Sequence, residues 1–194
     1  MSALAEKGVY RADDLLAMPD GQRFELVRGR LKERNMGSIS SWVGGLLYAR
    51  LLAYAADSRY GWVFPADNGY DGFPRGNVRF PDVSAVRYGR LPNEELPPGH
   101  MKLAPDFAAE VVSPNDRAGE LEEKLHDYRA AGVGLVWVIY PDTRTARAHR
   151  PDRTTTEYGE DDVMPGEAVL PGFAVRLGDL FPPPRAATDI GGSP

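Results

Sequence analysis

The chain has 194 residues, of which 42% are hydrophobic and 26% are charged, which fits one globular domain with a sizeable core. It contains no cysteine, which excludes disulfides, zinc–thiolate sites and cysteine nucleophiles and suits a reducing compartment. The net charge of -5 argues weakly against a nucleic-acid partner, because the non-specific affinity for a duplex comes from neutralising phosphates.

The N-terminal part predicts a short helix over residues 11–17 and a hairpin over residues 23–33. Glu25 lies in the first strand of that hairpin, between Phe24 and Leu26, so strand alternation places it opposite those two apolar residues. Taken alone, a glutamate in such a hairpin is typical of a solvated position.

A longer helix is predicted over residues 40–56, where Trp42, Leu46, Leu47 and Leu51 supply the packing face. A strand is expected near residues 62–64 and another near residues 78–86, within an apolar run that has arginines at its ends.

Asp82 follows Pro81, which marks a strand start, an edge or a bulge because proline lacks an N–H. By itself Asp82 is typical of a turn or a strand edge. The stretch over residues 88–105 is rich in proline and glycine and predicts a loop or lid beside the site to which Asp82 belongs.

Glu110 lies in the middle of a predicted strand within residues 105–114. Alternation puts Asp106, Ala108, Glu110 and Val112 on one face of that strand. A carboxylate among apolar neighbours costs free energy unless it is paired or binds a cation. Asp106 shares the face, but its Cα lies about 13 Å from that of Glu110 along a strand, so it is the weaker ligand candidate.

Lys124 lies on a helix predicted over residues 117–132, at the border of an apolar stripe that includes Leu121, Leu125 and Tyr128. Its long side chain can extend along the helix toward the sheet. Tyr128 is interpreted as core packing, and the charged residues of the helix are expected mostly on its wet side: Glu122, Glu123, His126, Asp127 and Arg129.

Three more strands are predicted over residues 135–140, 145–150 and 154–158. The fold class is therefore α/β, a single domain with a mixed central β-sheet flanked by helices. We expect residues 1–9 to be an N-terminal extension, residues 10–181 to form the domain and residues 182–194 to form a disordered tail.

Two strand-borne carboxylates followed by a helical lysine suit a phosphodiesterase that depends on Mg2+ or Mn2+. Magnesium takes oxygen ligands, commonly one or two carboxylates with waters and phosphate oxygens, so Asp82 and Glu110 are the predicted ligands. Lys124 is predicted to orient the attacking water or to stabilise the transition state as a point charge.

These motifs, in this order, resemble the PD-(D/E)XK nuclease superfamily and within it the Uma family of "putative restriction endonucleases". The resemblance spans about residues 10–181 and includes the segments FELVRGRL (24–31) and VLPGF (169–173). It implies a restriction-endonuclease-like fold and an endonuclease that hydrolyses DNA, and cutting both strands would favour a homodimer.

The resemblance adds Glu25 as a fourth catalytic candidate, the acid that the N-terminal element places near the metal. The chain departs from the pattern at Val112, where the superfamily usually has its lysine, and Lys124 is expected to replace that lysine. Many relatives also have a histidine early in the first long helix, where this chain has Ser40, Ser41 and Trp42.

Arginines around Asp82 predict a basic surface for nucleic acid, formed by Arg75, Arg79 and Arg87. A second group, at positions 144, 147, 150 and 153, could add to it, although a solvated strand face explains either group equally well.

Two other functions stay open. One is a nucleic-acid-binding or assembly module with the same fold and no catalysis, and the other is a phosphoesterase acting on RNA. The N-terminus has no apolar signal segment and the longest apolar run is too short to span a membrane, so we expect a cytoplasmic protein without membrane contact.

Overall fold

The computed structural model describes residues 8–34 and 37–183, and it centres on a mixed six-stranded sheet. The strands lie in the order β3 (Gly61–Pro65), β4 (Val83–Arg87), β5 (Phe107–Val111), β6 (Leu135–Tyr140), β7 (Thr145–His149) and β8 (Thr155–Tyr158). β5 and β6 are parallel, and the other neighbours are antiparallel. Because parallel strands need a crossover connection, α3 (Ala118–Ala130) lies between β5 and β6 in the chain.

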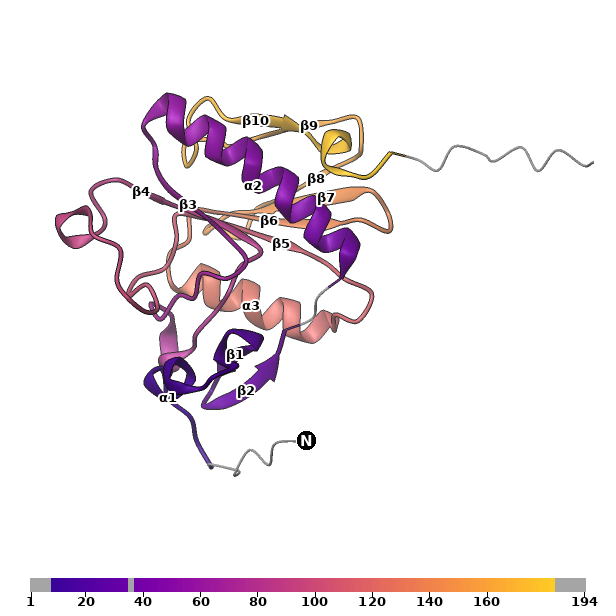
Figure 1. The fold of residues 1–194 in the computed structure, drawn as a ribbon. Coiled ribbons are helices and arrows are strands. Elements are labelled where there is room, and N and C mark those ends of the chain that lie inside the picture. Colours follow the sequence, from indigo (N-terminus) through magenta and orange to yellow (C-terminus); the bar gives the residue numbers. More distant parts are fainter. Residues whose placement is uncertain (1–7, 35–36, 184–194) are drawn as a thin grey trace, which may run out of the picture.

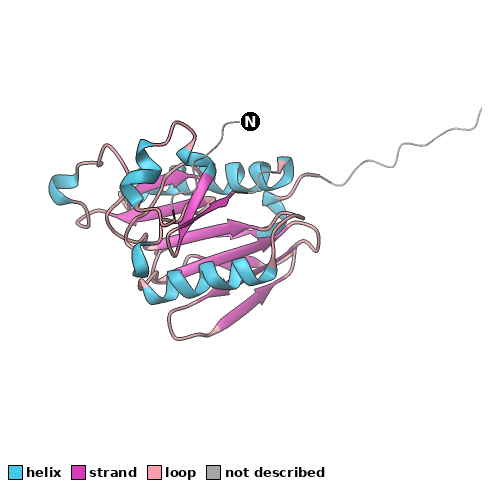
Figure 2. Ribbon diagram, turned by 90° about the horizontal axis from the view of Figure 1, so that it is seen from below, coloured by secondary structure: helices cyan, strands magenta, loops and turns pink. Residues whose placement is uncertain are grey.

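Two helices cover opposite faces of the sheet (Figure 1). α2 (Ser38–Ser58) packs on one face through Val43, Leu47 and Leu51, which are fully buried. α3 packs on the other face through Leu125 and Tyr128, and Figure 2, seen from below, shows it in front of the sheet. β5 therefore contributes Phe107, Ala109 and Val111 to the core under α2 and turns its remaining residues toward α3.

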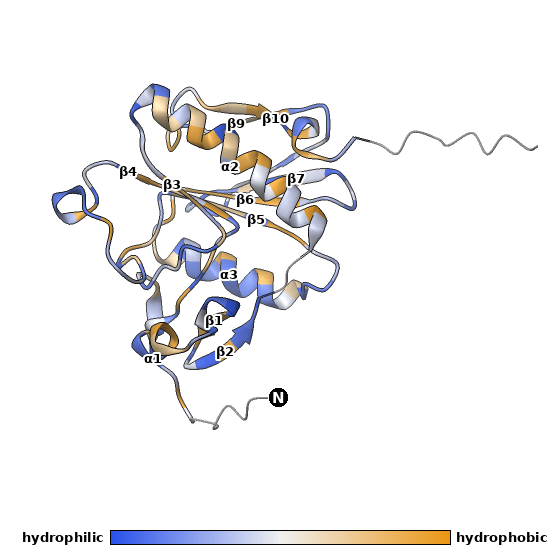
Figure 3. Ribbon diagram, viewed as in Figure 1, coloured by the Kyte–Doolittle hydropathy of each residue, from blue (hydrophilic) through white to orange (hydrophobic). Residues whose placement is uncertain are grey.

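A small N-terminal layer lies beyond α3 (Figure 1). It consists of α1 (Ala12–Ala17) and the hairpin of β1 (Phe24–Val27) and β2 (Arg30–Glu33). Leu26 pairs with Val78 through backbone hydrogen bonds in both directions, which ties the hairpin to the segment that precedes β4. In Figure 3 most of α3 is hydrophilic, whereas α2 carries hydrophobic residues along its length.

A second two-stranded sheet covers part of the α2 side and was not predicted. It pairs β9 (Val163–Pro165) with β10 (Ala174–Arg176) and is followed by a 3-10 turn over Leu177–Leu180. Met164, Leu170 and Leu177 from this region are fully buried in the core under α2. Strands of three residues are too short for alternation to show in the sequence.

The α/β class, the mixed central sheet and the flanking helices are confirmed. The strand predicted over residues 78–86 is wrong in extent: β4 begins at Val83, and the residues before Pro81 form isolated bridges to Leu26 and Tyr70 instead. The predicted domain limits stay predictions, and most of both predicted terminal segments, 1–7 and 184–194, lies outside the described residues. Within the part of the chain that the structure describes, no helix has the length and apolar character to cross a bilayer.

Candidate active site

The four side chains predicted as catalytic line one cavity of about 80 Å3, room for a few water molecules. Glu25 comes from β1, Asp82 from the residue before β4, Glu110 from β5 and Lys124 from α3. Residues that are 99 positions apart in the chain thus share one pocket. Residues 88–105, predicted as a loop or lid beside this site, form a loop with one 3-10 turn, but none of them lines the cavity, so the predicted place beside the site is wrong.

Glu110 is a buried carboxylate on the face of β5 that α3 covers, as strand alternation predicted. It is 5% exposed and accepts hydrogen bonds from Lys124 Nζ at 2.7 Å and from the Tyr128 hydroxyl. Burial raises the pKa of Glu110 to about 7 although the Lys124 charge opposes the rise, and the charges of Asp82 and Glu25 add to it. Tyr128 is therefore more than a packing residue, because its hydroxyl orients this carboxylate.

Asp82 immediately precedes β4, the strand that pairs with the β5 strand of Glu110. β4 and β5 pair antiparallel with Val83 opposite Ala109, and the Val111 N–H donates to Asp82 Oδ2 at 2.7 Å. Burial raises the pKa of Asp82, against the opposing charge of Lys124. Two neighbouring carboxyl groups whose pKa values are raised mainly by burial form a place where a bound cation would favour the ionised carboxylates.

Lys124 lies between two carboxylates. Its Nζ is 2.7 Å from Glu110 Oε2 and 3.0 Å from Glu25 Oε1. Burial by itself would lower the pKa of Lys124, but the charges of Glu110, Glu25 and Asp82 raise it above its ordinary value. The ammonium of Lys124 is therefore fixed by two carboxylates and is not solvated. The side chain extends from the helix to the sheet, as predicted.

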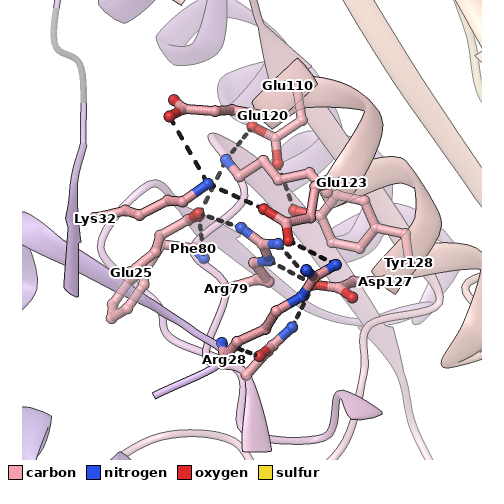
Figure 4. Close-up of polar contacts among 12 residues, drawn as sticks. Glu25, Arg28, Lys32, Arg79, Phe80, Glu110, Glu120, Glu123, Asp127 and Tyr128 are labelled. Atoms are coloured by element: carbon pink, nitrogen blue, oxygen red, sulfur yellow. Dashed lines mark hydrogen bonds and ion pairs between the residues drawn. The ribbon is translucent and has the colours of Figure 1, made fainter. Parts of the chain in front are cut away.

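Glu25 is buried at 6% exposure, unlike the solvated position that its hairpin alone would suggest. Its Oε1 accepts from the Phe80 N–H at 3.1 Å and its Oε2 accepts from Arg79 Nη1 at 2.8 Å (Figure 4). Burial would raise the pKa of Glu25, but the charges of Lys124 and Arg79 and the Phe80 N–H hold it below its usual value. The pKa of Glu25 is therefore lowered and that of Glu110 is raised, although both carboxylates contact Lys124.

The prediction that Arg79 binds nucleic acid is wrong, because the side chain is 1% exposed. It donates to Glu25 and, through Nε and Nη2 at 2.9 and 2.6 Å, to Asp127 Oδ2. Asp127, expected on the wet side of its helix, is also buried, at 5% exposure. The two residues satisfy each other's charge inside the protein, which leaves neither free for a phosphate.

Arg75 and Arg87, the other two residues of the predicted basic surface, lie outside the cavity. Arg75 is exposed on a turn, whereas Arg87 contacts Asp106 through its backbone N–H and its guanidinium. Three arginines of the second group pair with glutamates, as expected of a solvated strand face: Arg144, Arg147 and Arg150.

Other cations line the cavity and were missed: Lys32, Arg34 and Arg117. Arg34 donates to the carbonyl oxygens of Gln22 and Ala66 and lies 4.9 Å above the Phe80 ring. No local pattern identifies these residues, because each becomes a neighbour of the site only through tertiary packing.

The cavity offers a divalent cation two carboxylate ligands, those of Asp82 and Glu110. Across residues 8–34 and 37–183, no three His, Cys, Asp or Glu side chains are arranged to hold a metal ion. Asp82 and Glu110 with waters and phosphate oxygens match the way proteins bind Mg2+. The buried network and Asp82 hold four acids (Glu25, Asp82, Glu110, Asp127) against two cations (Arg79, Lys124), a formal excess of two negative charges.

Comparisons with known proteins place the chain among nuclease-like folds. The Uma2 family model, described as "Putative restriction endonuclease", matches residues 12–178. The crystal structure of a "putative nuclease belonging to DUF820" from Anabaena variabilis ATCC 29413 is similar, with a TM-score of 0.74 and 21% sequence identity. The similarity covers 88% of this chain and 97% of that one, and at this identity it shows the fold alone. No curated protein matches.

Proposed function

We propose that this chain, which belongs to the Uma2 family described as "putative restriction endonucleases", is a nuclease that hydrolyses DNA phosphodiester bonds with a divalent cation, Mg2+ or Mn2+. The observation that carries the proposal is the cavity that Asp82, Glu110 and Lys124 share, in which two carboxyl groups lie beside one ammonium. Asp82 and Glu110 would hold the cation. When bound, the cation acidifies a water molecule and offsets charge on the phosphate.

Lys124 supplies a fixed positive charge next to the metal ligands. Its ammonium, held by Glu25, can orient the attacking water or stabilise the negative charge that develops on the phosphate oxygens. Such a preorganised charge acts more strongly in a cavity that admits little water than in bulk solvent. Glu25 therefore assists through Lys124 and need not touch the metal.

The cations at the cavity, Lys32, Arg34 and Arg117, are the proposed contacts for the phosphates that flank the bond to be cut. Lys32 lies on the hairpin, where it pairs with Glu120 and Glu123 of α3, and Arg117 lies just before α3, so these cations flank the cavity where the hairpin meets the helix. We also propose that the protein acts in the cytoplasm as a homodimer, because cutting both strands of a duplex takes two sites.

Cleavage of supercoiled plasmid DNA, and of a labelled RNA in parallel, with Mg2+, Mn2+ or EDTA tests the proposal. We expect nicking only with metal, and loss of nicking in Lys124→Met with DNA binding retained in a mobility shift. Lys102→Met is the matched control, since Lys102 is 63% exposed, pairs with Asp71 and does not line the cavity.

Three outcomes of this experiment would overturn the proposal. DNA binding without cleavage in the wild type would indicate a silent binding module. Cleavage confined to RNA substrates would indicate an RNA phosphoesterase. Equal cleavage in wild type and Lys124→Met would remove Lys124 from the site.

A further inference from the structure

We infer that Arg79 and Asp127 form a buried positioning pair that holds Glu25, and through Glu25 the ammonium of Lys124, for the reaction proposed above. Arg79 uses all three of its guanidinium nitrogens inside the protein, one toward Glu25 and two toward Asp127 (Figure 4). Asp127 Oδ2 also accepts from Asn77 Nδ2 at 2.8 Å. Three of the five guanidinium N–H groups are used in this way, and at 1% exposure the side chain is out of reach of a substrate.

Stability alone gives little reason for this arrangement. Burying two carboxylates and a guanidinium costs desolvation free energy, and replacing such groups by apolar side chains of similar size is often neutral or stabilising. What the ionic network does provide is a fixed geometry, since the planar guanidinium fork bonds two carboxylates at set positions.

The ionic network fixes the position of Glu25, and Glu25 in turn contacts Lys124. Arg79 and the Phe80 N–H hold both oxygens of Glu25, so the carboxylate has no freedom to rotate. Lys124 contacts Glu25 and Glu110, and once Glu110 holds a cation, Glu25 is the anchor that keeps the ammonium beside it. The contacts run from Asp127 through Arg79 and Glu25 to Lys124. Asp127 and Lys124, at the two ends of this series, lie three residues apart on α3.

The pair also helps to dock the hairpin on α3, and that purely structural effect must be separated from positioning. Arg28 offers the control. Its side chain joins the hairpin to Glu123 on α3 at 3.1 Å and makes no contact with Glu25. Arg28→Gln therefore weakens hairpin docking and leaves the Arg79–Glu25–Lys124 contacts in place.

The test compares Asp127→Asn and the double variant Arg79→Met with Asp127→Leu against Arg28→Gln and wild type. The double variant covers the case in which Asp127→Asn fails to fold, because it removes the whole pair. For both pair variants we expect kcat for plasmid cleavage to fall at least tenfold while KM for DNA stays within about twofold, with Arg28→Gln near wild type. Unchanged kcat in the folded pair variants, or a rise confined to KM, would overturn the inference.

A second readout does not depend on cleavage. The sequence has only four lysines, so 13C labelling of their ε carbons gives a simple NMR spectrum in which Lys124→Met identifies one signal. We expect the chemical shift of the Lys124 signal to change in both pair variants and to stay the same in Arg28→Gln. A signal that stays in place in all of them would overturn the inference even if the wild type cuts nothing, so failure of the proposed nuclease function can be distinguished from failure of the positioning role.

Discussion

Magnesium binding should weaken on acidification because Glu110 must lose its proton to act as a ligand. Burial raises the pKa of Glu110 from 4.5 to about 7 against the opposing charge of Lys124. With that pKa, roughly a tenth of the molecules have Glu110 ionised at pH 6 and roughly nine-tenths at pH 8. The dissociation constant for Mg2+ should therefore be about tenfold higher at pH 6 than at pH 8.

The same group should make the metal-free protein less stable as the pH rises. The folded pKa of Glu110 lies above the ordinary value, so between pH 4.5 and about 7 the folded chain keeps a proton that the unfolded chain releases. The contribution of Glu110 to the free energy of unfolding is thus largest below pH 4.5 and falls as the pH rises through about 7, by about 3 kcal/mol in all.

Two assays check this prediction. Calorimetric titration with Mg2+ at pH 6, 7 and 8 gives the affinities, and urea unfolding at pH 4.5 to 8 gives the stabilities, each for wild type and Glu110→Gln. The amide does not titrate, so its stability should lack the Glu110 component. Equal Mg2+ affinity at pH 6 and pH 8, or the same stability profile in both proteins, would refute the reasoning.

Three further substitutions test the packing around the site and the sheet. Tyr128→Phe removes the hydroxyl that donates to Glu110 and should cost about 1 to 3 kcal/mol in urea unfolding, and an unchanged stability would mean that the hydroxyl does not support the carboxylate. Gly61→Ala should destabilise the protein by at least about 1 to 3 kcal/mol, because a Cβ there would lie 2.1 Å from the Val86 carbonyl oxygen at a φ of +151°, and wild-type stability would contradict that geometry. Gly45→Ala meets nothing within 4 Å inside α2 and should stabilise by about 0.5 to 1 kcal/mol, so a lower melting temperature would count against the description of that helix face.

Local periodicity predicted the parts of the site that depend on a single element. Strand alternation placed Glu110 on the face opposite Phe107 and Val111, and helical spacing put Lys124 within reach of the sheet. The strand over Leu135–Tyr140 was predicted to the residue because its apolar run is continuous. The α/β class and the Uma family resemblance are confirmed by the fold and by the family match.

Contacts between distant segments could not be predicted in this way. Arg79 and Asp127 each look like solvated residues in the sequence, and only their pairing across 48 positions makes burial tolerable. The hydroxyl of Tyr128 is another example, since an apolar helix position does not reveal which carboxylate its polar end meets. Arg34 is held at the cavity by carbonyl groups of a 3-10 turn and of a loop, Gln22 and Ala66, which leaves no pattern in its own segment.

The most direct test of the central claim measures metal binding and plasmid nicking on the same samples of wild type and of the double variant Asp82→Asn with Glu110→Gln. Both changes keep the shape of the side chains and remove the charge that would attract a cation. The account predicts that the wild type binds Mg2+ and nicks DNA, and that the double variant remains folded and does neither. A wild type that binds no divalent cation, or a double variant that nicks at the wild-type rate, would contradict it.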